Sequence, residues 1–277
     1  MTASAKIVLV SGTVKARDVV GHHDYLAGCR LAAFLLAQTA NVSVVMVHDG
    51  WPEDERILTG ARALVFYTGG VDKHAFVHSA TRIATLQRLI DEGTGLVMLH
   101  QAVRYSRAFA AQAMRWIGGV HVSPEAGRGH WPTNHRRFPT HPVTRGVQPW
   151  TIRDGWMNEI QFVDDMEGIT PLVWSGSRHQ GSAAGGRADV VGWTYDRPDG
   201  GRSFCFTGLD SHWAWAVPSV RQLVVNGILW SAGVNVPLAG APCTVDETHL
   251  GSYLTPRLPK EARVLGRLWR RLRRAGT

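Results

Sequence analysis

The stretch Gly95-Leu-Val-Met-Leu-His-Gln101 decides the fold class, because a short apolar run leads directly into two polar side chains. No polar residue alternates with the apolar ones, which is typical of a strand buried on both faces of a parallel sheet. Three earlier runs have the same character, each flanked by turn residues: Lys6–Ser11, Val42–His48 and Arg62–Tyr67. The sequence therefore predicts a central sheet of short parallel strands.

Helical patterns separate these strands. Apolar residues recur at helical spacing from Leu26 to Leu35 and from Ile83 to Ile90, and Tyr105–Ile117 predicts a further helix. Strands that alternate with helices form βαβ units, in which the helices cover the sheet. We therefore expect an α/β fold with an open, mostly parallel sheet and helices on both faces.

The second half of the chain extends this pattern. Three strands, a hairpin connection and a closing helix are expected there, at Ile169–Trp174, Val190–Tyr195, Ser203–Thr207, Arg197–Gly201 and Pro218–Ser231. The stretch Gly118–Trp150 is rich in Gly, Pro, His and Arg without a sustained period, so we expect a functional loop. The predicted organisation is one domain over residues 1–240 with an active-site insertion at about 118–160, followed by a C-terminal extension over 241–277.

The basic charge is concentrated at the C-terminal end. Of the net charge of +8, residues 257–277 carry +7, from eight Lys or Arg and one Glu, which leaves +1 for residues 1–256. A nearly neutral body argues against a nucleic-acid surface, which requires clustered cations. The apolar residues between Val264 and Leu272 predict a basic amphipathic helix, either solvated or in contact with a membrane surface or a partner.

Cysteine usage and missing motifs exclude several classes. Cys29, Cys205 and Cys243 are widely spaced and odd in number, so we expect neither a disulfide framework nor a thiolate metal site, and a cytoplasmic location fits best. No phosphate-binding glycine motif occurs, so no nucleotide cofactor is expected. His100 stands where a nucleophilic cysteine would have to follow its strand, which excludes a cysteine-dependent glutamine amidotransferase.

Histidines follow several predicted strands. Because ligands bind beyond the carboxyl ends of parallel strands, His22, His100 and His212 should converge on one pocket, together with Asp210. We predict catalytic roles for His22 and His100, and a divalent metal site (Zn, Mn, Fe or Ni) formed by His22, His100, Asp210 and His212. The alternative for each histidine is a helix cap or a polar group satisfied within the fold.

Carboxylates and aromatic rings lie near the same loops. Glu159 is a candidate general base, and Asp154 a candidate base or metal ligand, although both could equally be solvated. Trp213, Trp156 and Trp131 are candidates for stacking on a sugar ring, against the alternative that they belong to the core.

Five motifs together resemble the ThuA-like proteins, over about residues 6–236: Gly21-His-His-Asp-Tyr25, Val65-Phe-Tyr-Thr-Gly69, Gly95-Leu-Val-Met-Leu-His100, His141-Pro-Val-Thr-Arg-Gly146 and Thr207-Gly-Leu-Asp-Ser-His-Trp-Ala-Trp215. The resemblance implies a flavodoxin-like, glutamine amidotransferase-like fold and a link to trehalose utilisation and keto-sugars made by a partner dehydrogenase. It also adds His23 and Tyr67 to the substrate-binding candidates. Similar proteins often have His where this chain has Asp210 and an acid where it has Gly155.

The function we expect from these features is an enzyme acting on a sugar or keto-sugar glycoside, of lyase, hydrolase or isomerase type, with proton abstraction that a metal assists. The two departures leave an alternative, a non-catalytic carbohydrate-binding or scaffold protein. The expected partners are a small sugar or keto-sugar, a sugar dehydrogenase and a second copy of the chain, with no nucleic acid.

Overall fold

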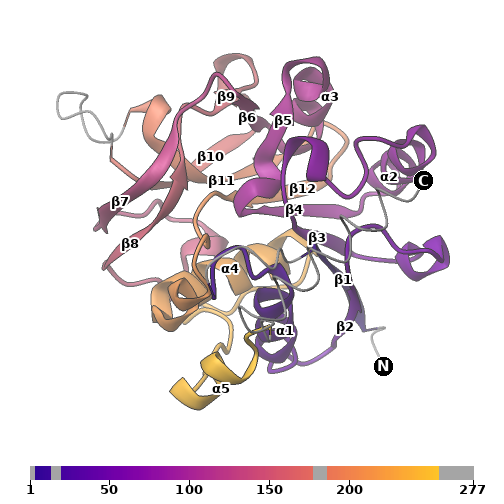
Figure 1. Ribbon diagram of the computed structural model, residues 1–277. Coiled ribbons are helices and arrows are strands. Elements are labelled where there is room, and N and C mark those ends of the chain that lie inside the picture. Colours follow the sequence, from indigo (N-terminus) through magenta and orange to yellow (C-terminus); the bar gives the residue numbers. More distant parts are fainter. Residues whose placement is uncertain (1–3, 14–19, 177–185, 256–277) are drawn as a thin grey trace, which may run out of the picture.

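A seven-stranded sheet runs through the middle of the protein, whose computed structural model describes residues 4–13, 20–176 and 186–255 (Figure 1). In spatial order its strands are β10 (Ile169–Trp174), β11 (Val190–Asp196), β12 (Arg202–Phe206), β4 (Gly95–Leu99), β3 (Ala63–Tyr67), β1 (Ala5–Ser11) and β2 (Val42–Val47). The five strands from β12 to β2 are parallel, and β11 and β10 extend one edge in antiparallel pairing. The strands predicted from apolar runs agree with these bounds within about two residues.

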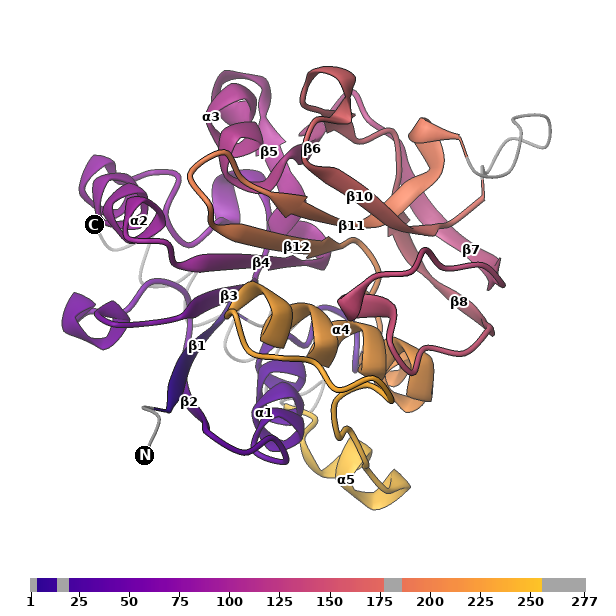
Figure 2. The ribbon, with the colours of Figure 1, turned by 180° about the vertical axis from the view of Figure 1, so that it is seen from behind.

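Helices cover both faces of this sheet (Figures 1 and 2). Alternate strand residues face α1 (Tyr25–Leu36) and α4 (Pro218–Ser231) on one side, where Leu9, Val65 and Phe204 are buried. The intervening residues, such as Val8 and Met98, face α2 (Ala80–Asp91) and α3 (Arg107–Ile117). The predicted fold class, an open and mostly parallel α/β sheet covered on both faces, is therefore confirmed.

The start of α1 is fixed by its cap. The carboxylate of Asp24 accepts a hydrogen bond from the backbone N–H of Ala27, and its oxygens also accept from the N–H and hydroxyl of Thr255. A carboxylate at this position satisfies an N–H group that has no partner within the helix. The turn that precedes α1, with His22 and His23, is thereby anchored against the end of the described chain.

The stretch Gly118–Trp150 is not a loop throughout, because two strands run through it. β6 (Gly119–Ser123) joins β5 (Arg104–Ser106) and β9 (Gln161–Phe162), and β7 (Arg128–His135) pairs only with β8 (Trp150–Met157) as a two-stranded ribbon. Exposed and covered residues alternate along β7, so the strand has no apolar run by which it could be recognised. Ribbon strands that are solvated on one face give only this weak period of two.

Short elements complete the described chain: α5 (Glu247–Ser252) and the 3₁₀ turns η1 (Glu55–Leu58), η2 (Val71–Lys73), η3 (His100–Val103), η4 (Pro142–Thr144), η5 (Asp164–Met166), η6 (Arg187–Asp189) and η7 (His212–Ala216). The basic helix expected near the C-terminus lies outside the described residues. Within those residues, every helix is too short or too polar to cross a membrane.

Candidate metal centre

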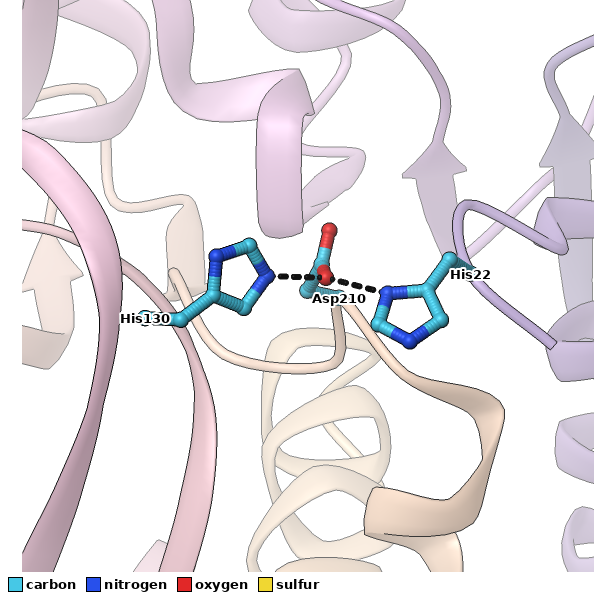
Figure 3. Close-up of side chains that lie close together, drawn as sticks. All are labelled: His22, His130 and Asp210. Carbon is cyan, nitrogen blue, oxygen red and sulfur yellow. Dashed lines mark hydrogen bonds and ion pairs between the residues drawn. The ribbon is translucent and has the colours of Figure 1, made fainter. Parts of the chain in front are cut away.

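One carboxylate, that of Asp210, lies among four imidazoles. Its Oδ2 atom is 2.8 Å from Nδ1 of His22 and 2.7 Å from Nε2 of His130 (Figure 3). Its Oδ1 atom is 2.7 Å from Nε2 of His23 and 3.1 Å from Nε2 of His100. Each oxygen therefore meets two histidines.

The fold brings these residues together from four places in the chain. His100 begins η3 directly after β4, and Asp210 follows β12, the neighbouring parallel strand. The turn before α1 reaches the same edge, where His23 donates its backbone N–H to the carbonyl of Asp210. His130 comes from the ribbon strand β7. The rule that ligand sites form beyond the carboxyl ends of parallel strands thus accounts for the location.

Backbone conformation at the cluster is unusual. His23, His100 and Leu209 have φ values of 48°, 54° and 71°, in the left-handed region that non-glycine residues seldom adopt. Each such residue costs on the order of 1 kcal/mol or more, and these conformations concentrate at functional sites. These backbone conformations direct the side chains of His23 and His100 toward a common point. The conformation of Leu209 does the same for the Asp210 that follows it.

On the buried side of the cluster, Nε2 of His100 and Oδ1 of Asp210 face each other without a hydrogen bond. Nδ1 of His100 donates to the carbonyl of Thr207 at 2.9 Å, so in the neutral ring Nε2 carries a lone pair. This buried Nε2 atom makes no hydrogen bond, although Oδ1 of Asp210 is 3.1 Å away. Two lone pairs that face each other are stabilised by an additional proton or by a cation between them.

The second histidine is held through the nitrogen that faces the carboxylate. Arg104 donates to Oε1 of Gln101, which turns Nε2 of this amide toward Nε2 of His23 at 2.8 Å. Because the amide nitrogen donates, Nε2 of His23 carries the ring's lone pair, and this atom is also 2.7 Å from Oδ1 of Asp210, so a cation would replace the amide as its partner. Donor atoms of His23, His100 and Asp210, called here the inner triad, therefore converge on one place. Two neutral imidazoles and a carboxylate are typical of a divalent metal site.

The outer pair, His22 and His130, is different. Both rings make contacts of hydrogen-bond geometry with Oδ2 of Asp210, and their side chains are 38% and 54% exposed. These two rings can donate a proton to the carboxylate and exchange it with solvent. With Asp210 they form a second group of three that could also hold a cation.

A second buried carboxylate, Asp154, holds the loop that carries Asp210. Its oxygens accept from the backbone N–H groups of Leu209 at 2.7 Å, Ser211 at 3.2 Å and Gly155 at 2.8 Å. Burial raises the pKa of Asp154, against the opposing effects of His100 and these three donors. Asp154, a candidate base or metal ligand by sequence, thus has its oxygens engaged with backbone and acts as a positioning residue.

We expect Asp154→Asn to weaken metal binding about tenfold, as the loss of a group that orients a metal ligand commonly does. The amide NH₂ would face a backbone N–H, leave it without an acceptor, and lower the free energy of unfolding by about 1–3 kcal/mol. Zn²⁺ titration and urea denaturation measure both effects. The exposed Asp196→Asn is the matched control, and equal behaviour of the two variants would contradict this role for Asp154.

A pocket of about 270 Å³ opens beside the cluster. The residues that line it are His23, His100, Gln101, Arg104, Arg128, Gly129, His130, Gly155, Trp156, Met157 and Asp210. Its size is near the lower end of the ~300–1,000 Å³ typical of small-molecule sites. The pocket fits one small ligand between the cluster and the β7–β8 ribbon.

The structure brings most of the predicted residues together. His22, His23, His100 and Asp210 meet in the cluster, and the buried Trp156 lines the pocket. The remaining candidates, which are not among the pocket-lining residues, are His212, Glu159, Trp213, Tyr67 and Trp131.

Each of these five residues has another environment. Nε2 of His212 contacts the carbonyl of Leu250 at 2.8 Å, away from the Asp210 carboxylate. The exposed Glu159 accepts from the N–H of Gly127, Trp213 is half-exposed, and Tyr67 is buried with its hydroxyl donating to the carbonyl of Leu209. Trp131 lines a separate cavity with Trp174.

The sequence patterns gave little or no indication that three residues belong to the site: His130, Arg104 and Arg128. Arg128 and His130 are two positions apart, and residues at this spacing share one face of a strand. That period of two was the available signal, but the surrounding Gly and Pro residues obscured it. Arg104 lies in a short strand that the sequence pattern merged with the following helix.

The fold and the site define an α/β protein with a histidine and carboxylate cluster at the carboxyl ends of its parallel strands. His100 occupies the position that follows β4, and none of the three cysteines lines the pocket. The sequence pattern of the family described as "ThuA: Trehalose utilisation" matches residues 8–231. The chain belongs to this family, which confirms the resemblance.

Solved structures of ThuA-like proteins have a similar fold. A ThuA-like protein from Bacteroides uniformis is 11% identical, with a TM-score of 0.60, over 85% of this chain and 96% of that chain. One from Parabacteroides merdae is 14% identical, with a TM-score of 0.58, over 87% and 96%. A comparison with curated protein sequences gives no match.

Proposed function

We propose that this protein is a metal-dependent enzyme that acts on a sugar or keto-sugar, with the inner triad as the cation site. The observation that carries the proposal is the convergence of lone pairs from His23, His100 and Asp210 on one point beside a small pocket. Membership of a family linked to trehalose utilisation supports a sugar as the substrate. Zn, Mn, Fe and Ni suit this donor set.

A bound divalent cation would polarise a carbonyl oxygen of the substrate. The inner triad would hold the cation, and the outer pair, which reaches solvent, would transfer protons. His22 or His130 removes the proton beside the carbonyl, and the electron pair moves into an enolate. Return of the proton to the neighbouring carbon gives isomerisation, whereas departure of a group from the carbon beyond gives elimination. Trp156 forms the apolar wall against which a ring can pack.

The proposal has consequences for partners and location. A keto-sugar requires the prior oxidation of a hydroxyl, so a sugar dehydrogenase would supply the substrate. We keep a cytoplasmic location and a homo-oligomer as parts of this proposal. In this proposal His22 acts as a base and His100 as a metal ligand, while Glu159 and His212 lie outside the cluster.

One observation favours a second function, a non-catalytic carbohydrate-binding protein. Both departures from the family's usual residues, Asp210 and Gly155, fall inside the cluster, where an ideal Cβ on Gly155 would lie 2.6 Å from that of Asp210. A site altered at its centre can retain ligand binding while losing turnover. Sugar binding without turnover by the metal-loaded protein would favour this second function.

The deciding experiment is elemental analysis of the purified, untagged protein and of two matched variants, His100→Gln and His212→Gln. We expect near-stoichiometric metal in the native protein and in His212→Gln, because Nε2 of His212 contacts the carbonyl of Leu250. His100→Gln should bind metal at least about tenfold more weakly, since it loses an imidazole ligand. A native protein that stays metal-free after reconstitution would refute the proposal, as would equal metal loss in both variants.

A further inference from the structure

Two arginines, Arg104 and Arg128, line the end of the pocket beyond Gln101. Neither forms an ion pair with an acidic residue within the described part of the chain. Guanidinium groups beside a ligand pocket normally pair with a carboxylate or a phosphate. The pocket therefore contains uncompensated positive charge.

Arg104 is buried, with only 8% of its surface exposed. It donates from Nη1 to Gln101 at 3.2 Å and from Nη2 to the hydroxyl of Ser123 at 2.8 Å, whereas its buried Nε makes no hydrogen bond. Both of these acceptors are neutral. Burying a charge without an opposite charge is unfavourable, so this arrangement costs stability that an anion in the pocket would offset.

The electrostatic surroundings of Arg104 are positive. Burial lowers the pKa of Arg104, and Arg128 lowers it further, so the two guanidinium groups are near enough to repel each other. His121 has a pKa of about 4, because burial lowers it and both arginines add to this effect. The neutral His121 therefore contributes no compensating interaction with either arginine.

Among the described residues, no carboxylate forms a hydrogen bond with either arginine. Asp72 favours the charged form of Arg104 without a hydrogen bond to it. Glu125 pairs with Arg107 at 2.9 Å, and Glu159 accepts from the backbone N–H of Gly127. The exposed Arg128 is thus available to a ligand, since no hydrogen bond or ion pair of its side chain occurs among the described residues.

We propose that Arg104 and Arg128 form a subsite for an anionic group of the substrate, a carboxylate or a phosphate, so that the substrate is a sugar acid or a sugar phosphate. This inference rests on the proposed function, because it names the substrate class of the same site. Gln101 links the subsite to the inner triad, donating to His23 and accepting from Arg104. Only this amide separates the arginine from a triad residue, so a compact ligand can reach both.

The test compares three probes on the full-length protein: D-glucuronate, glucose 6-phosphate and glucose. Calorimetry should give a dissociation constant at least about tenfold lower for one of the two anions than for glucose, the discrimination expected of a charge-assisted contact. The preferred anion distinguishes a carboxylate subsite from a phosphate subsite. Binding of glucose equal to that of both anions would overturn the subsite, and so would failure of both anions to bind.

The informative variant is Arg128→Gln, because the side chain is exposed and its loss should leave the fold intact. We expect it to weaken binding of the preferred anion about tenfold, with Arg128→Lys retaining part of the affinity. Arg115→Gln, an exposed arginine on α3, is the matched control. An unchanged anion affinity in Arg128→Gln would refute the assignment.

The same samples separate the two proposals. Metal content of Arg128→Gln should equal that of the native protein, and anion binding should be measured with and without Zn²⁺. Normal metal binding with no anion preference would refute the subsite alone. Arginine-dependent anion binding by a protein that cannot hold metal would instead refute the cation site and leave the subsite standing.

Discussion

Asp210→Asn should lower the affinity for Zn²⁺ or Mn²⁺ by more than about a hundredfold and abolish turnover. This loss is larger than that expected for a residue that only orients a metal ligand. Asp210 is the one residue whose carboxylate contacts all four histidines. The amide keeps the size of the side chain but removes the negative charge and replaces one acceptor oxygen by a donor. Metal titration followed by elemental analysis measures the effect.

The control for this variant is Asp164→Asn, which makes the same chemical change at an exposed position. Circular dichroism and thermal denaturation establish that each variant folds. If the folded Asp210→Asn variant bound metal within a few-fold of the native affinity, the carboxylate would not be a metal ligand.

Gly155→Ala should both destabilise the protein and disrupt the metal centre. An ideal Cβ at this position would lie 2.6 Å from Cβ of Asp210, 2.9 Å from its Cγ and 3.1 Å from Nε2 of His130. Because Gly155 and Asp210 are both buried, the contact is relieved only by displacing the carboxylate or the ribbon. We expect a loss of about 1–3 kcal/mol in the free energy of unfolding, as for other overpacked sites, together with loss of bound metal.

Gly251→Ala adds the same methyl group in α5, where nothing lies within 4 Å of the new Cβ. That variant should keep its stability and metal content. Urea denaturation and elemental analysis of the two alanine variants compare like with like. If Gly155→Ala were as stable and bound as much metal as Gly251→Ala, the close approach of Gly155 to Asp210 would not be required for folding or metal binding.

The parallel sheet and part of the cluster could be predicted from sequence because both follow from local patterns. Gly95–Leu99 and Pro218–Ser231 have the predicted bounds in the structure, since each is a short run with a clear period and clear ends. The strand-end rule then indicated that His22, His100 and Asp210 would lie at one edge of the sheet.

The rest of the cluster depends on contacts between distant segments. His130 reaches Asp210 across 80 positions of the chain, through a ribbon whose polar alternation predicts no particular place in space. His212 stands two positions from Asp210, yet the 3₁₀ turn that begins there directs its ring to Leu250. A sequence pattern places a residue in an element, but the direction of a side chain in a turn follows from tertiary packing.

The two departures from the family's usual residues are neighbours in space, which the sequence alone does not show. Asp210 and Gly155 are 55 positions apart, and the carboxylate of Asp210 occupies the space into which a side chain at position 155 would project. A side chain at position 155 and the carboxylate of Asp210 would therefore compete for the same small volume.

The two sides of the pocket differ in stability, because one side is the β7–β8 ribbon and the other is the edge of the central sheet. Its strands pair with each other and with no further strand of the described chain, and isolated two-stranded hairpins are only marginally stable. β8 is buried from Asp154 to Met157, whereas β7 is largely exposed, so the amide hydrogens of β7 should exchange with solvent before those of β4. Opening of β7 would carry away His130 and Arg128, while Asp154 on β8 would keep its hydrogen bonds to the loop that carries Asp210. A ligand can then enter and leave without unfolding the sheet.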